Sequence, residues 1–116
     1  MISDLSGEEA KASMNRLVES ATAVEAWFAG NGVDVIIPGI LRSDPGGRYR
    51  VSKAEGPGPQ LAVDPKYFAG CKYVDKASIP DFSRGVLTSI AEFSSALVFK
   101  VKDGSVFTIF EVTRPN

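Results

Sequence analysis

The sequence predicts one small α+β domain, in which two helices pack on an antiparallel sheet of about four to five strands ending in a C-terminal β-hairpin. Three observations support this: an apolar stripe with helical spacing near the N-terminus, a second such stripe after residue 81, and strand-forming residues around a turn near the C-terminus. The chain of 116 residues has an ordinary length for a single core, so residues 1–116 are expected to be one domain.

The first helix is predicted to begin after Ser6 and to end near Ala29. Ser6 and Glu9 have the Ser-x-x-Glu spacing of a capping box. Gly30-Asn31-Gly32 tolerates the positive φ at which many helices end. Between these limits the apolar residues recur every three or four positions: Ala10, Met14, Leu17, Ala21, Val24 and Phe28.

The middle of the chain favours a hairpin followed by irregular structure. A strand is predicted at 33–37, interrupted at Pro38-Gly39 and resuming at 40–41, and it is joined by turn residues 43–47 to a second strand at 48–51. Residues 54–81 are rich in glycine and proline. Within them we expect a short strand at 60–64, one helical turn at 65–70 and an edge strand at 73–74.

A second helix is predicted over residues 82–94, with Asp81 as its N-cap, although the segment 86–88 would also suit a strand. The strands 96–102 and 105–113 flank Asp103-Gly104, the preferred two-residue type I′ turn. That turn would pair Phe99 with Thr108, and Phe107 with Lys100. Both faces of this hairpin are apolar, so the second face is either covered, which we favour, or exposed for a partner.

The composition excludes several kinds of chemistry. The chain has no histidine and one cysteine, Cys71, so histidine-dependent hydrolysis, structural zinc and an internal disulfide are ruled out. We therefore expect no metal site and no cofactor. The N-terminus is acidic and no apolar run approaches the roughly 20 residues of a membrane helix, so a cytoplasmic protein that does not insert into membranes is expected.

A basic cluster around the turn at 43–47 is the first candidate site. It consists of Arg42, Arg48, Arg50 and Lys53, of which Arg48 and Arg50 are expected to share one face of a strand and to grip an anion. This cluster supports a small-anion or nucleotide-binding domain, or a nuclease that uses Arg, Lys and Tyr in place of histidine. The pI near 5.4 argues against a dedicated nucleic-acid binder without excluding a local patch.

The leading functional hypothesis is a small non-enzymatic protein-binding module, of the inhibitor, immunity or adaptor type that phages and bacteria encode. Glu19 and Glu25 are expected on the outer face of the first helix, where they could meet a basic partner. Phe107 and Ile109 are the residues of the C-terminal hairpin that a protein partner, or a second copy in a homodimer, would cover. Catalysis by carboxylates or arginines is unsupported rather than excluded, so an enzyme is the less favoured alternative.

Overall fold

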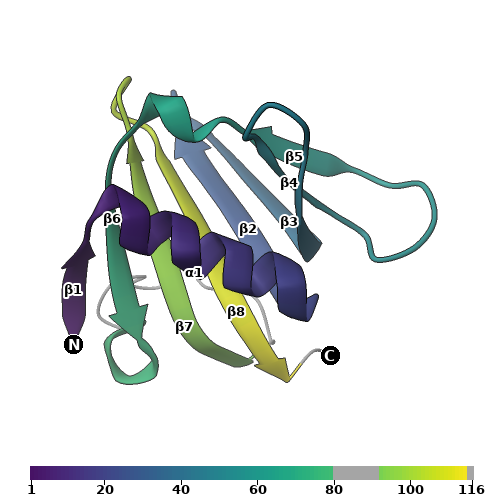
Figure 1. Cartoon of the computed structure of the whole chain (residues 1–116), viewed down its shortest axis with the longest axis horizontal. Coiled ribbons are helices and arrows are strands. Elements are labelled where there is room, and N and C mark those ends of the chain that lie inside the picture. The colour runs from purple at the N-terminus through teal and green to yellow at the C-terminus, as the bar shows by residue number, and fades with distance from the viewer. Residues whose placement is uncertain (80–91, 115–116) are drawn as a thin grey trace.

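The computed structural model describes residues 1–79 and 92–114, which form one curved sheet with a helix across one face (Figure 1). The sheet order is β1-β6-β7-β8-β2-β3-β4-β5, and every neighbouring pair is antiparallel. The strands are β1 (Ile2–Leu5), β2 (Ala23–Gly30), β3 (Val33–Ser43), β4 (Tyr49–Ser52), β5 (Gln60–Val63), β6 (Phe68–Asp75), β7 (Glu92–Val101) and β8 (Val106–Arg114). The helix is α1 (Gly7–Ser20), and two 3-10 helices, η1 (Pro65–Tyr67) and η2 (Lys76–Ser78), flank β6.

This architecture corrects the predicted fold class. The described residues form a mostly β structure with eight strands and one α-helix, whereas the sequence predicted an α+β domain with two helices and about four to five strands. Most of the second predicted helix, 82–94, lies outside the described residues. Its last part, from Glu92, is the start of β7 and not helix.

The first helix is shorter than predicted. Its capping box is confirmed: Ser6 Oγ accepts from the Glu9 N–H at 3.1 Å, and Glu9 Oε1 accepts from the Ser6 N–H at 2.9 Å. The helix ends where Ala21 adopts the left-handed conformation with φ 49°. Asn31 and Gly32, with φ 54° and 75°, do not cap a helix but form the tight turn between β2 and β3.

The predicted hairpin in the middle of the chain is confirmed, because β3 pairs with β4 across the turn at 43–47. The short strand at 60–64 is confirmed as β5, which adds to β4. The strand predicted at 73–74 exists but is longer and is not at an edge, since β6 lies between β1 and β7. The sheet edges are instead β1 and β5, on opposite sides of the molecule (Figure 1).

The C-terminal hairpin exists, but its predicted register is wrong by one residue. Phe99 pairs with Phe107, because the chain reverses through a longer loop than a two-residue turn. The Val101 N–H donates to the Ser105 carbonyl at 2.9 Å, the Gly104 N–H donates to the Val101 carbonyl at 2.9 Å, and only Gly104 in this loop has a positive φ. A turn followed by one left-handed glycine is typical of three-residue hairpin loops.

The corrected register decides which side chains face α1. Phe107 and Ile109, at 0% and 1% exposure, are buried on the α1 side together with Leu97 and Phe99. The opposite side of the sheet has its own smaller cluster: Val74, Ile79, Phe93, Ala96, Val98 and Phe110. No helix in the described parts of the chain is long and apolar enough to cross a membrane.

Candidate functional site

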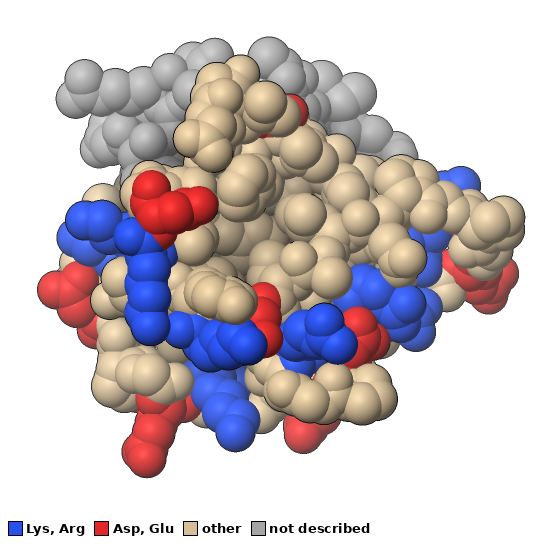
Figure 2. Space-filling model, turned by 90° about the horizontal axis from the view of Figure 1, so that it is seen from above, with Lys and Arg blue, Asp and Glu red and all other residues tan. Residues whose placement is uncertain are grey.

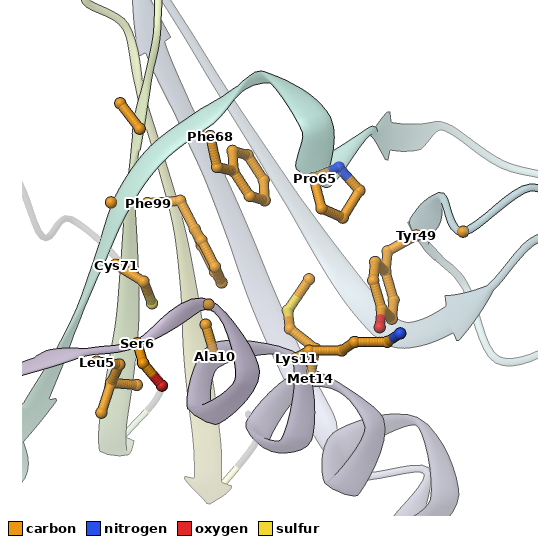
Figure 3. A pocket seen from close by; sticks show the side chains of 14 residues that line it. Leu5, Ser6, Ala10, Lys11, Met14, Tyr49, Pro65, Phe68, Cys71 and Phe99 are labelled. Atoms are coloured by element: carbon orange, nitrogen blue, oxygen red, sulfur yellow. The ribbon is translucent and has the colours of Figure 1, made fainter.

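A cavity of about 460 Å³ lies between the first half of α1 and the inner face of the sheet. Its walls come from five places in the sequence: the end of β1 with the start of α1, the turn into β4, η1, the first half of β6, and Phe99 of β7 (Figure 3). The side chains that define it are Ala10, Lys11, Met14, Tyr49, Phe68 and Phe99. A hollow of this size lies within the range of roughly 300–1,000 Å³ that is ordinary for ligand pockets.

Residue size and one hydrogen bond explain why the space stays open. Ala10 faces the sheet from α1 with only a methyl group, one turn before the larger Met14. Further along the helix, the Tyr49 hydroxyl donates to Asn15 Oδ1 at 2.7 Å. This bond ties β4 to α1 and holds Tyr49 at one end of the cavity, where it is 5% exposed. The curved sheet thus wraps around the helix without closing on its first turns.

Aromatic rings form the wall opposite the helix. Phe68 stacks on Phe99 with ring centroids 4.4 Å apart, and its centroid lies 6.2 Å from that of Phe107. Phe68 also lines a second hollow of about 360 Å³, whose other residues include Phe28 and Val101. Phe68 is thus the residue that the linings of the two hollows share.

The cavity wall is neutral except at one position. Burial raises the pKa of the Cys71 thiol to about 12, so this group stays protonated near neutral pH. Burial also raises the pKa of Tyr49. Lys11 is the one charged residue that lines the cavity, and within residues 1–79 and 92–114 it makes no ion pair or hydrogen bond. Its side chain extends from α1 in the direction of Tyr49 (Figure 3).

These features suit the binding of an apolar or amphipathic molecule better than other chemistry. Ligand pockets typically have volumes of roughly 300–1,000 Å³, apolar walls and a small number of polar groups. No cluster of three or more Cys, Asp and Glu side chains suitable for a metal occurs in the described part of the chain. The protonated Cys71 is a poor nucleophile, because the thiolate is the reactive form.

The predicted anion cluster is divided by the structure. Arg42 and Arg50 are paired across β3 and β4, but both are occupied: Arg42 Nη2 donates to the Ala54 carbonyl at 2.9 Å, and Arg50 lies 3.4 Å from an Asp44 carboxylate oxygen. Arg48 precedes β4, so it does not share a strand face with Arg50 as predicted.

The other two members of that cluster are free of such contacts. Arg48 and Lys53 are exposed and form no ion pair or side-chain hydrogen bond with the residues that the structure describes. Figure 2 shows basic and acidic side chains interleaved over one end of the molecule, so no face of a single charge is visible there. Anion binding by the four residues together remains a prediction from the sequence.

The four residues predicted to meet a protein partner are not on one surface. Glu19 is exposed on α1 as expected. Glu25 was expected on the same helix face but lies in β2, where it is 7% exposed and accepts a hydrogen bond from Trp27 Nε1 at 2.9 Å. Phe107 and Ile109 are buried in the core beneath α1, so the folded domain does not offer them to a partner.

Comparisons with known proteins support the fold alone. No protein-family model and no curated protein sequence matches the chain. A crystal structure of ChuX is similar in fold, with a TM-score of 0.57 and 12% sequence identity over 94% of this chain. The chain spans 61% of the length of that ChuX chain. At this level of identity the likeness extends to the path of the backbone and not to a site.

The cavity was not among the sites predicted from the sequence. Cys71 entered the sequence analysis only as the single cysteine, Met14 only as part of the helical apolar stripe, and Lys11 and Phe68 belonged to no motif. Its walls come from segments up to 94 positions apart, from Leu5 to Phe99, so no local spacing marks them. The available signal was the position of Ala10, a small residue on the otherwise larger apolar stripe of the helix.

Proposed function

We propose that this chain is a non-enzymatic binding protein whose cavity beneath α1 takes a small apolar or amphipathic ligand. The observation that carries the proposal is the cavity of about 460 Å³, walled by Met14, Phe68 and Phe99 and open beside Ala10. An apolar ligand in this space would leave water for contacts with aromatic and aliphatic side chains, at roughly 25 cal/mol for each Å² buried.

The same residues argue for binding without catalysis. Apart from Lys11, the titratable groups of the wall are held in their neutral forms, since burial raises the pKa of both Cys71 and Tyr49. General acid–base catalysis needs a group whose pKa lies near the working pH. A protonated thiol and a protonated phenol instead provide a neutral wall for an apolar molecule.

A thermal-shift screen with apolar and amphipathic small molecules tests this proposal. A ligand that binds only the folded state raises the midpoint of unfolding with increasing concentration. Ala10→Phe places a ring in the cavity and should abolish the shift. The matched control is Ala12→Phe, on the same helix at an exposed position, which should leave the shift unchanged.

Two results would contradict the proposal: no shift with any member of the screen, or equal shifts for the two variants when both are folded by circular dichroism. If Ala10→Phe fails to fold, protection of Cys71 from a thiol reagent by the ligand provides the decisive measurement, because Cys71 lines the same cavity.

A cytoplasmic protein-binding module of the inhibitor, immunity or adaptor type is a second candidate. The observation that favours it is Ile36 on β3, a large apolar side chain that is 45% exposed. Partner association should weaken with Ile36→Asp and, if the acidic face of α1 takes part, with Glu19→Lys. A purified complex that forms equally well with both variants would contradict this candidate.

A further inference from the structure

We propose that the ligand of the cavity is a monocarboxylate with an apolar body, whose carboxylate binds the Lys11 ammonium at the rim. This inference rests on the proposed small-ligand function and specifies its chemistry. It follows from the distribution of charge around the cavity: the lining residues are uncharged except for Lys11.

Lys11 has the arrangement expected of a lysine that serves a ligand. Lys11 lines the cavity and is nevertheless exposed, which is common for lysines whose aliphatic stems lie on apolar surfaces. Glu8 lies one helical turn earlier on the same side of α1, yet no carboxylate of the described residues lies within ion-pair distance of Lys11. The positive charge therefore remains available to an anion.

The neighbouring basic residues differ in whether they have an acidic partner. Lys66 and Lys72, on η1 and β6, lie 3.7 Å from Asp64 and Asp4 respectively, so their charges are already matched. Arg48 has no such partner, and it stands between Gly47 and Tyr49, two residues that line the cavity. Lys11 is the basic residue that lines the cavity, so an anionic group placed at the rim near Tyr49 gains from its charge.

The wall restricts the remainder of the ligand. Leu5, Met14, Phe68 and Phe99 offer no partner for a second charge, and an unpaired charge is strongly disfavoured in such surroundings. A cationic ligand would meet the Lys11 ammonium and be repelled. One negative charge at one end of an apolar body satisfies both the rim and the wall.

Isothermal titration calorimetry with dodecanoate and dodecanol tests this inference, because the two probes share a chain and differ in charge. Wild type should bind dodecanoate about ten-fold more tightly than dodecanol. Lys11→Met should remove this preference by weakening dodecanoate binding to the level of dodecanol binding, and Lys11→Arg should retain it. Lys76→Met is the matched control, since Lys76 is exposed on η2 away from the cavity.

The outcomes distinguish a failure of the carboxylate proposal from a failure of the proposed function. Equal binding of the two probes by wild type would refute the proposal that the ligand is a carboxylate, while leaving the proposed function intact. A preference for dodecanoate that survives Lys11→Met would refute it in the same way. Tighter binding of dodecylamine would refute it also. Failure of both probes and of every apolar compound in the thermal-shift screen would instead overturn the proposed function itself. Lys11 is exposed on the helix surface, so the methionine variant is expected to fold.

Discussion

The reactivity of Cys71 is a sensitive probe of the cavity, because this residue is the only cysteine in the chain and lines the cavity wall. Burial raises the pKa of its thiol from an ordinary value near 9 to about 12. Three pKa units reduce the thiolate fraction at pH 8 by about a thousand-fold, and the thiolate is the form that reacts with alkylating reagents. Iodoacetamide should therefore label the folded chain about a thousand-fold more slowly than the chain unfolded in urea.

Mass spectrometry of samples quenched at successive times measures both rates directly. For the folded chain, the rate should rise about ten-fold for each pH unit between pH 7 and pH 9, where the thiol is still almost entirely protonated. Dodecanoate at saturating concentration should slow labelling further. A folded-state rate within ten-fold of the unfolded rate would refute the description of Cys71 as a buried group in an apolar wall.

The same pKa shift has a consequence for stability, and its sign follows from linkage. The unfolded chain releases the Cys71 proton above about pH 9, whereas the folded chain retains it until about pH 12. Stability should therefore fall as the pH rises through this interval. Urea unfolding between pH 8 and pH 11 measures the slope, and Cys71→Val should reduce it. A slope identical in the two proteins would contradict the assignment.

Three further predictions concern the frame of the site. Gly39→Ala should lower the free energy of unfolding by about 2–3 kcal/mol, because a Cβ there would overlap the Ser52 backbone carbonyl. The control is Gly7→Ala, where a Cβ would meet open space and the free energy of unfolding should change little. Urea unfolding of the two variants measures the difference. Ser6→Ala should cost about 1 kcal/mol in the same assay through loss of the helix cap, and no change would refute the role of that cap. Phe68→Ala should join the two hollows, so that hexadecanoate binds more tightly relative to dodecanoate than it does in wild type, as measured by isothermal titration calorimetry. An unchanged ratio of the two affinities would contradict the expectation that the Phe68 side chain divides the hollows.

The sequence predicted local features well where they depend on neighbouring residues. The capping box at Ser6, the hairpin around residues 43–47 and the short strand β5 all follow from side chains close together in the chain. The end of the first helix was missed because Val24 and Phe28 continue its apolar spacing by coincidence. Asn31-Gly32 is a strong signal for a two-residue hairpin turn. Had this signal been preferred to the helical spacing, residues 23–30 would have been predicted as a strand, which they are in β2.

The register error shows how one residue changes a functional expectation. Asp103-Gly104 suits a two-residue turn, but the loop that forms includes Lys102, whose N–H donates to the Tyr67 carbonyl at 2.8 Å. This contact with η1 is long-range and has no local signal. A shift of one position moves side chains to the opposite face of a strand, which is why Phe107 was paired with the wrong partner.

The cavity could not be predicted, because it is formed by elements that meet only in the folded sheet. Strands β4 and β6 are separated by four other strands in the sheet order, yet Tyr49 and Phe68 line the same space beside α1 (Figure 3). Their approach depends on the curvature of the sheet around the helix. Sequence patterns report which residues are apolar, but not where the packing between them is left incomplete.

A crystal structure of the chain with dodecanoate bound would test the central claim most directly. We predict the alkyl chain beneath α1, between Ala10 and Phe68, with a carboxylate oxygen about 3 Å from Lys11 Nζ. Dodecanoate bound on the outer face of the sheet near Ile36, or bound beneath α1 with its carboxylate turned away from Lys11, would contradict it.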